Sequence, residues 1–131
     1  MKKRIAPKGQ FETIRSQLIL FRLFLDGKEL THIPLLEGEE ALKLLSLKDN
    51  LIDKVQNLVS LPNLIYLDLT NNKISELENF QGMANLRVLI VGKNKLTRIK
   101  KLDCLNKLEI LDLDSNLITN TEGLKLLPDL K

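Results

Sequence analysis

The side chains that most often carry catalysis or metal binding are scarce in this sequence. It contains one histidine, His32, and one cysteine, Cys104. A zinc site draws several ligands from His and Cys, and a nucleophilic Ser or Cys needs a base beside it. The single histidine rules out a two-histidine metal site, and we interpret His32 as a surface turn residue and Cys104 as a small packing residue. We therefore expect a protein that is not an enzyme, with no catalytic residue, no cofactor and no metal.

Two short stretches imitate the loops that bind nucleotides and calcium. The apolar run LRVLIV ends at Gly92-Lys93-Asn94, but a phosphate-binding loop also needs an earlier glycine and a hydroxyl after the lysine, which this stretch lacks. The run DLDSN at 112–116 begins like a calcium loop, yet Leu117 and Gly123 stand where that loop needs Gly and Glu. Neither stretch matches a ligand-binding loop, so the pattern of these residues must have another explanation.

The composition and the distribution of charge exclude further classes. Aromatic residues make up 4% and Trp is absent, which disfavours an aromatic-lined cofactor cleft. The net charge of +3 comes from the first ten residues, which carry four basic and no acidic side chains, so residues 11–131 are close to neutral. This basic tail can contact phosphates, anionic lipid or an acidic peptide, or it is a solvated terminus. No apolar run of membrane-spanning length and no signal-peptide pattern is present, and a single cysteine suits a reducing compartment, so we expect a cytoplasmic protein without a membrane partner.

The residues of the apparent loops instead occupy fixed positions of an internal repeat. Leu86, Leu89, Val91 and Asn94 form a framework that recurs every 22 residues along the chain. Its units start at Leu20, Leu42, Leu64, Leu86, Leu108 and Leu130. Lys28 stands where the first unit should have its asparagine. Repetition at this period predicts a stack of similar structural units.

The units match L-x-x-L-x-L-x-x-N-x-I, and residues 20–130 therefore resemble the leucine-rich repeat family. Apolar residues at every third position, as in Leu77, Phe80 and Met83, resemble the 22-residue class named for a regulator of protein phosphatase 1. The resemblance implies an α/β repeat fold, a solenoid with a parallel concave β-sheet and a 3₁₀ or irregular convex side. We predict a flexible basic tail at 1–10, a cap segment at 11–19, and repeats at 20–131, five complete and a sixth begun.

The repeated asparagine has a structural interpretation. After each strand the chain turns, which leaves backbone groups unpaired, and unpaired buried polar groups are costly. An amide side chain offers both a donor and an acceptor. We expect a stacked ladder that bonds the turns of neighbouring units, formed by Asn50, Asn72, Asn94 and Asn116.

The remaining candidates for function lie on the surface of the sheet. Alternate strand residues point to one face, so the third, fifth and seventh positions of each unit should line the concave side. We predict an apolar stripe with an acidic border that binds a partner: Arg22, Phe24, Leu44, Tyr66, Asp68, Val88, Ile90, Ile110, Asp112 and Asp114. The alternative for Val88 and Ile110 is that neighbouring side chains half bury them.

The resemblance also implies a function, which is non-catalytic binding of other proteins. LRVLIVGKNKL and LEILDLDSNLI look most like the ciliary and tubulin-polyglutamylase-complex members, which implies a subunit of a microtubule- or cilium-associated complex with tubulin or axonemal partners. The alternatives are a regulatory subunit of a protein phosphatase and a subunit of an RNA–protein complex, although direct nucleic-acid binding is not expected. Because KLLPDLK stops as a sixth unit begins, we also expect this end to be continued or covered by another chain.

Overall fold

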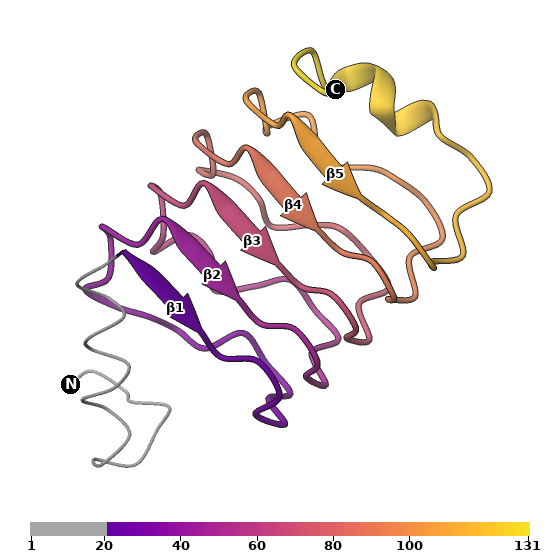
Figure 1. Ribbon diagram of the computed structural model, residues 1–131. Coiled ribbons are helices and arrows are strands. Elements are labelled where there is room, and N and C mark those ends of the chain that lie inside the picture. Colours follow the sequence, from indigo (N-terminus) through magenta and orange to yellow (C-terminus); the bar gives the residue numbers. More distant parts are fainter. Residues whose placement is uncertain (1–20) are drawn as a thin grey trace.

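The computed structural model describes residues 21–131, which form a single parallel sheet backed by turns (Figure 1). Five strands run in sequence order: β1 Arg22–Phe24, β2 Leu44–Ser46, β3 Tyr66–Asp68, β4 Val88–Ile90 and β5 Ile110–Asp112. A 3₁₀ helix, η1, follows at Glu122–Leu126. This arrangement confirms the predicted repeat solenoid. The predicted basic tail at 1–10 and cap segment at 11–19 lie outside the described residues.

The strand register follows the repeat of the sequence. Every paired residue lies opposite the residue 22 positions later, as Tyr66 lies opposite Val88. Each strand is only three residues long, because a left-handed residue soon turns the chain away from the sheet. The left-handed residues at equivalent positions after the five strands are Gly27, Asp49, Asn71, Lys93 and Ser115. Their backbone conformation favours Gly and Asn, so Lys93 is an unusual occupant.

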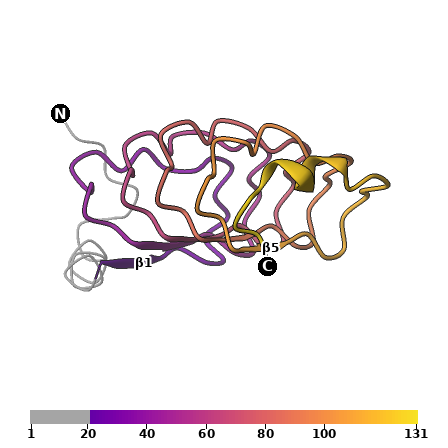
Figure 2. The same cartoon turned by 90° about the horizontal axis from the view of Figure 1, so that it is seen from above.

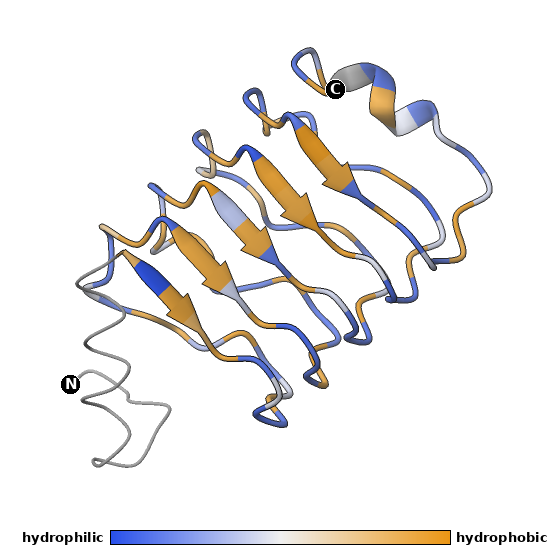
Figure 3. Cartoon of the chain, viewed as in Figure 1, coloured by the Kyte–Doolittle hydropathy of each residue, from blue (hydrophilic) through white to orange (hydrophobic). Residues whose placement is uncertain are grey.

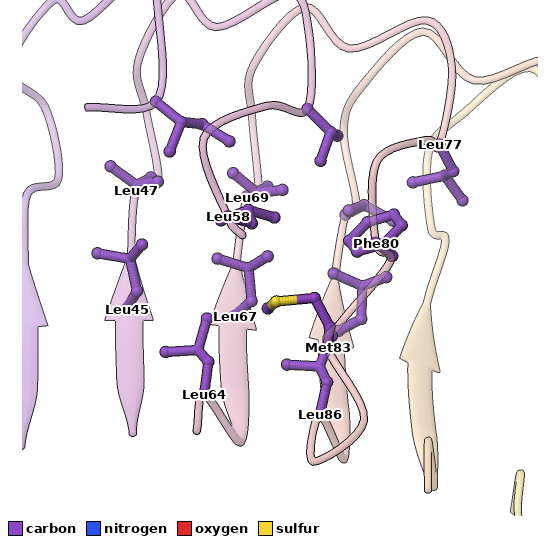
Figure 4. Close-up of a cluster of buried hydrophobic side chains, with 14 of the residues drawn as sticks. Leu45, Leu47, Leu58, Leu64, Leu67, Leu69, Leu77, Phe80, Met83 and Leu86 are labelled. Carbon is purple, nitrogen blue, oxygen red and sulfur yellow. The ribbon is translucent and has the colours of Figure 1, made fainter. Parts of the chain in front are cut away.

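The core lies between the sheet and the returning segments, which occupy the opposite side of the molecule (Figure 2). The central leucine of each inner strand points inward and is fully buried, as in Leu45 and Leu67. From the other side, Phe80 and Met83 pack among the leucines (Figure 4). Because each unit is too small to enclose its own apolar side chains, burial depends on the unit stacked beside it.

The returning segments are mostly turns, and the described residues contain no α-helix. Between residues 21 and 131, no helix has the length and apolar character needed to cross a bilayer.

The repeated asparagines connect neighbouring units through the backbone. Asn94 Nδ2 donates to the carbonyl of Leu69 in the preceding unit at 2.9 Å, and to Val91 and Gly92 in its own turn. Its Oδ1 accepts from the Ile74 amide at 3.0 Å. Equivalent bonds are made by Asn50, Asn72 and Asn116. Each asparagine reaches back one unit, whereas Lys28, at the equivalent position of the first unit, has no amide side chain with which to make these bonds.

The two ends of the stack differ in how well their apolar residues are covered. Leu111 and Leu113 in the last unit are half-buried, whereas Leu89 and Val91 at the same positions one unit earlier are fully buried. The backbone amide of Lys131 donates to the carbonyl of Glu109 at 2.8 Å, in register with the earlier units. Coverage of this end by a further segment or another chain stays a prediction.

Candidate protein-interaction surface

The face of the sheet turned away from the core carries a row of apolar side chains, which we call the apolar stripe: Leu44, Tyr66, Val88, Ile90 and Ile110. Figure 3 shows that the strands are largely hydrophobic, while β1 begins with the charged Arg22. Ile110 is 50% exposed, and the other four side chains are partly exposed. Neighbouring residues therefore cover both Val88 and Ile110 in part, as the alternative interpretation expected, and they cover Val88 more than Ile110.

Phe24 extends the exposed apolar area at the β1 end of the same face. Its side chain is 46% exposed and lies in register with Ser46 on β2 and, beyond it, Asp68 on β3. Ser46 and Asp68 are both buried, so Phe24 is separated from Ile90 by polar residues. The exposed apolar area is therefore continuous along the third-position column and interrupted along the fifth.

The carboxylates that border the stripe are occupied largely by their own chain. Asp26 Oδ1 accepts from the Ser46 hydroxyl at 2.6 Å and from the Lys48 amide at 3.0 Å. Asp68 accepts from the amide and hydroxyl of Thr70 at 2.9 and 2.5 Å, and only 8% of Asp68 is exposed. The predicted contact residue Asp68 therefore offers little surface and instead stabilises the turn after β3.

The last two carboxylates are more open. Asp112 Oδ1 accepts from the Asp114 amide at 2.9 Å, and an Asp114 carboxylate oxygen accepts from the Ser115 hydroxyl at 3.1 Å. Both aspartates are exposed. The predicted acidic border is thus accessible mainly at β5.

A group of cations at the N-terminal ends of the strands was not among the predicted site residues. Lys43, Arg87 and Lys107 line a shallow hollow of about 320 Å³ together with Asn63, Ile65 and Asn85. These residues precede the strands or lie between the first leucine and the strand, at positions that the alternation argument did not consider. The signal was present in the sequence as basic residues beside the first leucine of several units.

His32 and Cys104 are the two residues whose types could support catalysis or metal binding. His32 is exposed and its Nδ1 lies 2.8 Å from the Thr31 hydroxyl. Cys104 is partly buried, and burial raises the pKa of its thiol, with a smaller contribution from the negative charge of Asp103. A raised pKa lowers the thiolate population and so the nucleophilicity at neutral pH. Residues 21–131 bring together no group of three His, Cys, Asp or Glu side chains suited to a metal ion.

Two family models match consecutive parts of the chain. The model described as two copies of leucine-rich repeats matches residues 40–82, and the model described as leucine rich repeat matches residues 75–118. The stacked strands and the asparagine bonds extend over the same residues. The chain belongs to the leucine-rich repeat family.

Two solved structures with a similar fold are longer than this chain. Internalin C2 from Listeria monocytogenes is 30% identical with a TM-score of 0.75, and the match covers 83% of this chain and 48% of internalin C2. The leucine-rich repeat domain of APL1B is 22% identical with a TM-score of 0.79, and the match covers 99% of this chain and 41% of that domain. The leucine-rich repeat chain thus spans less than half of either structure.

A third solved structure comes from a complex with nucleic acid. TLR13 in complex with ssRNA13 is 29% identical with a TM-score of 0.69, and the match covers 84% of this chain and 17% of TLR13. No curated protein matches the sequence. The comparisons show the leucine-rich repeat fold, which is a typical non-catalytic scaffold for protein–protein interaction.

Proposed function

We propose that this leucine-rich repeat protein is a non-catalytic scaffold that binds a partner protein across the open face of its sheet. The observation that carries the proposal is the apolar stripe, in which Ile110 is 50% exposed and Tyr66 lies beside Leu44 and Val88. The buried leucines on the other face already form the core, so folding does not need these side chains. Contiguous exposed apolar surface with polar borders is typical of protein-binding sites.

Tyr66 is suited to be the centre of such a contact. It lies on the middle strand, is partly exposed, and has apolar neighbours on both adjacent strands. Tyrosine is enriched among the residues that dominate binding energy, because it buries a large ring and keeps a hydroxyl for hydrogen bonding. The remaining stripe residues would add area and exclude water around it.

A photo-crosslinking experiment tests this assignment. A photoreactive amino acid replaces Tyr66 in one variant, and in the control it replaces Val59, which is 77% exposed and lies outside the sheet. We expect one defined crosslinked partner from Tyr66 and none from Val59, with loss of the partner when Ile90 is changed to Glu. Equal crosslinking from both positions, or full binding by the Ile90→Glu variant, would contradict the proposal.

A more specific proposal is that the partner belongs to a cytoplasmic microtubule- or cilium-associated complex. A second is that the repeats belong to the 22-residue class named for the phosphatase 1 regulator. Their support is the resemblance of LRVLIVGKNKL and LEILDLDSNLI to ciliary and tubulin-modifying members, together with the strict 22-residue register. Co-sedimentation with assembled microtubules tests the first, with the Ile90→Glu variant as the control. Absence of the wild-type protein from the microtubule pellet in a ciliated-cell extract would contradict it.

Two alternatives predict different results in matched assays. A phosphatase regulator should co-elute with the phosphatase 1 catalytic subunit during gel filtration. A subunit of an RNA–protein complex should bind RNA with an affinity that falls steeply with salt, because contacts to phosphates release counterions. The RNA alternative is supported by the similarity of the chain to TLR13, which was solved in complex with ssRNA13.

A further inference from the structure

We infer that the N-terminal rim of the sheet binds an acidic peptide segment that also carries aliphatic side chains. The inference rests on the proposed function, since it specifies the chemistry of the partner segment. The rim is made of two adjoining shallow hollows. The first is lined by Lys43, Asn63, Ile65, Asn85, Arg87 and Lys107. The second is lined by Phe21, Arg22, Lys43, Leu44, Ile65 and Tyr66.

The two hollows form one surface because Lys43 and Ile65 line both. The second hollow also contains Leu44 and Tyr66, so the rim is continuous with the apolar stripe. A partner that covers the stripe can therefore reach the cations without leaving the sheet. Phe21 is 46% exposed and adds an aromatic side chain at the β1 end.

The charges on the rim are largely uncompensated within the described chain. Among residues 21–131, Arg22, Lys43 and Lys107 form no ion pair. Lys107 Nζ donates to Asn85 Oδ1 at 3.3 Å, which leaves its charge unneutralised. Arg87 lies 3.6 Å from a Glu109 carboxylate oxygen, but both side chains reach solvent, and exposed pairs of this kind contribute little. Three of the four rim cations thus have no ion-pair partner among residues 21–131, and the fourth, Arg87, has one solvent-exposed partner.

The acidic border on the opposite side of the stripe differs in this respect. Asp26, Asp68 and Asp112 each accept hydrogen bonds from the chain itself. A partner would have to replace those bonds to use these carboxylates fully, whereas the rim cations can gain an ionic partner at little cost. The electrostatic potential of this face therefore favours a negatively charged segment that lies over the N-terminal rim.

The geometry of the sheet suggests how the acidic residues of the partner are spaced. Lys43 and Arg87 occupy the same repeat position two strands apart. Adjacent strands lie about 4.8 Å apart, so these positions are separated by roughly 10 Å. An extended peptide running across the strands advances about 3.3 Å per residue, so carboxylates three residues apart match the two cations. Aliphatic residues between them would meet Ile65 and Leu44.

The apolar floor distinguishes a peptide from a simple polyanion. Phosphates or sulfates on a sugar backbone would contact the cations but leave Ile65 and Leu44 uncovered. A segment with an acidic residue at every third position and aliphatic residues between them satisfies both features. Glu109, which precedes β5, interrupts the basic rim, and its carboxylate pairs with both Arg87 and Lys131. Lys107 reaches back to Asn85 in the unit of β4, so the acidic segment should lie across β1–β4.

Binding of synthetic peptides tests this inference directly. The probe is a fluorescein-labelled peptide of repeated Glu-Leu-Ser units. The comparison peptides replace every Glu by Lys or every Leu by Gly, and a labelled oligouridine represents single-stranded RNA. We expect the wild-type protein to bind the Glu-Leu-Ser peptide at least about tenfold more tightly than either comparison peptide, and binding to weaken as salt is added.

Two charge-matched double variants locate the binding surface. The rim variant combines Lys43→Glu with Lys107→Glu, and the control combines Lys54→Glu with Lys73→Glu, which are exposed residues after the strands. We expect the rim variant to lose about tenfold or more in affinity for the Glu-Leu-Ser peptide and the control to change by less than about twofold. Circular dichroism establishes that both variants are folded.

Three outcomes would overturn the inference: equal affinity of the rim variant and the control, equal affinity of the acidic and basic peptides, or tighter binding of oligouridine than of any peptide. Failure of the inference is separable from failure of the proposed function. If the rim variant still crosslinks its partner through position 66 with unchanged affinity, while Ile90→Glu abolishes the crosslink, the scaffold function stands and the acidic-segment inference is wrong.

Discussion

Asn94 Nδ2 lies 2.9 Å from the carbonyl oxygen of Leu69, a residue 25 positions earlier and in the neighbouring repeat. This bond, with the one that Asn94 Oδ1 accepts from the Ile74 amide, joins two units through their backbones. Similar bonds recur in the units before and after it. The solenoid is therefore held together by buried amide groups as well as by its apolar core.

Replacement of Asn94 by Ala should lower the free energy of unfolding by about 3 kcal/mol, because it leaves several buried backbone groups without partners. The same change at Asn116 should cost about 1 kcal/mol, since that residue is half-buried and water can reach its partners. Urea denaturation measures both values. Asn106→Ala, at an exposed position, is the matched control, and equal losses at 94 and 106 would contradict the ladder.

A second set of asparagines predicts a stabilising substitution at Lys101. Asn57 and Asn79 have positive φ and donate at 2.7 Å to the carbonyls of Ile33 and Val55, each 24 residues earlier. Lys101 has the same left-handed backbone at the next equivalent position but lacks an amide. Lys101→Asn should raise the free energy of unfolding by about 1 kcal/mol, because Asn tolerates this conformation and can donate to the carbonyl of residue 77.

Thermal and urea unfolding measure the effect of Lys101→Asn. Two further variants separate its causes. Lys101→Gly relieves the backbone strain without adding a hydrogen bond, and Lys100→Asn adds the amide at the neighbouring position, where φ is not positive. We expect Lys101→Asn to raise the free energy of unfolding more than Lys101→Gly does, and Lys100→Asn to leave it unchanged. A stability below that of the wild type would show that the second asparagine position does not extend to this unit.

Gly123 is required where η1 packs against the preceding unit. A Cβ added there would lie 2.1 Å from the carbonyl oxygen and 2.7 Å from the carbonyl carbon of Ile99. Because the contact is with backbone, a side chain cannot move away to relieve it. Gly123→Ala should lower the unfolding free energy by about 1–3 kcal/mol and displace η1.

Hydrogen exchange of the amides near η1, together with the melting temperature, measures this effect. Lys125→Ala, an exposed change in the same helix, should leave both unchanged. The substitution Ile99→Ala should not restore the stability lost in Gly123→Ala, because the backbone carbonyl of residue 99 remains in place. Rescue by the double variant would refute the backbone clash.

Ser60 carries the one buried side-chain polar atom without a hydrogen-bond partner in the described part of the chain. Removal of this hydroxyl in Ser60→Ala should raise the unfolding free energy by about 1 kcal/mol, because a buried group without a partner loses its hydration and gains nothing. Denaturant unfolding measures the gain, and Ser75→Ala at an exposed position should be neutral. A loss of stability in Ser60→Ala would mean that the hydroxyl is bonded.

The sequence by itself determined the repeat, the register and the inward residues. A constant interval of 22 residues places Leu45, Leu67 and Leu89 opposite one another, because units of equal length stack with their strands parallel and in the same register. It also determined which side chains share the open face, since alternation along a strand is a local property of the backbone. For that reason the repeat alone assigns two columns of side chains to this face: Leu44–Tyr66–Val88–Ile110 and Phe24–Ser46–Asp68–Ile90–Asp112.

Only the tertiary structure decided how exposed those residues are and which charges are free. Asp68 and Asp112 occupy the same repeat position, yet Asp68 is buried and Asp112 is exposed, because Asp68 lies between two further strands and Asp112 lies on the last. Likewise Asp26 bonds to Ser46 while Lys43 and Lys107 form no ion pair within residues 21–131. Accessibility and charge compensation depend on atoms far apart in the sequence, so a repeat pattern can assign a residue to a face but not establish whether it is available there.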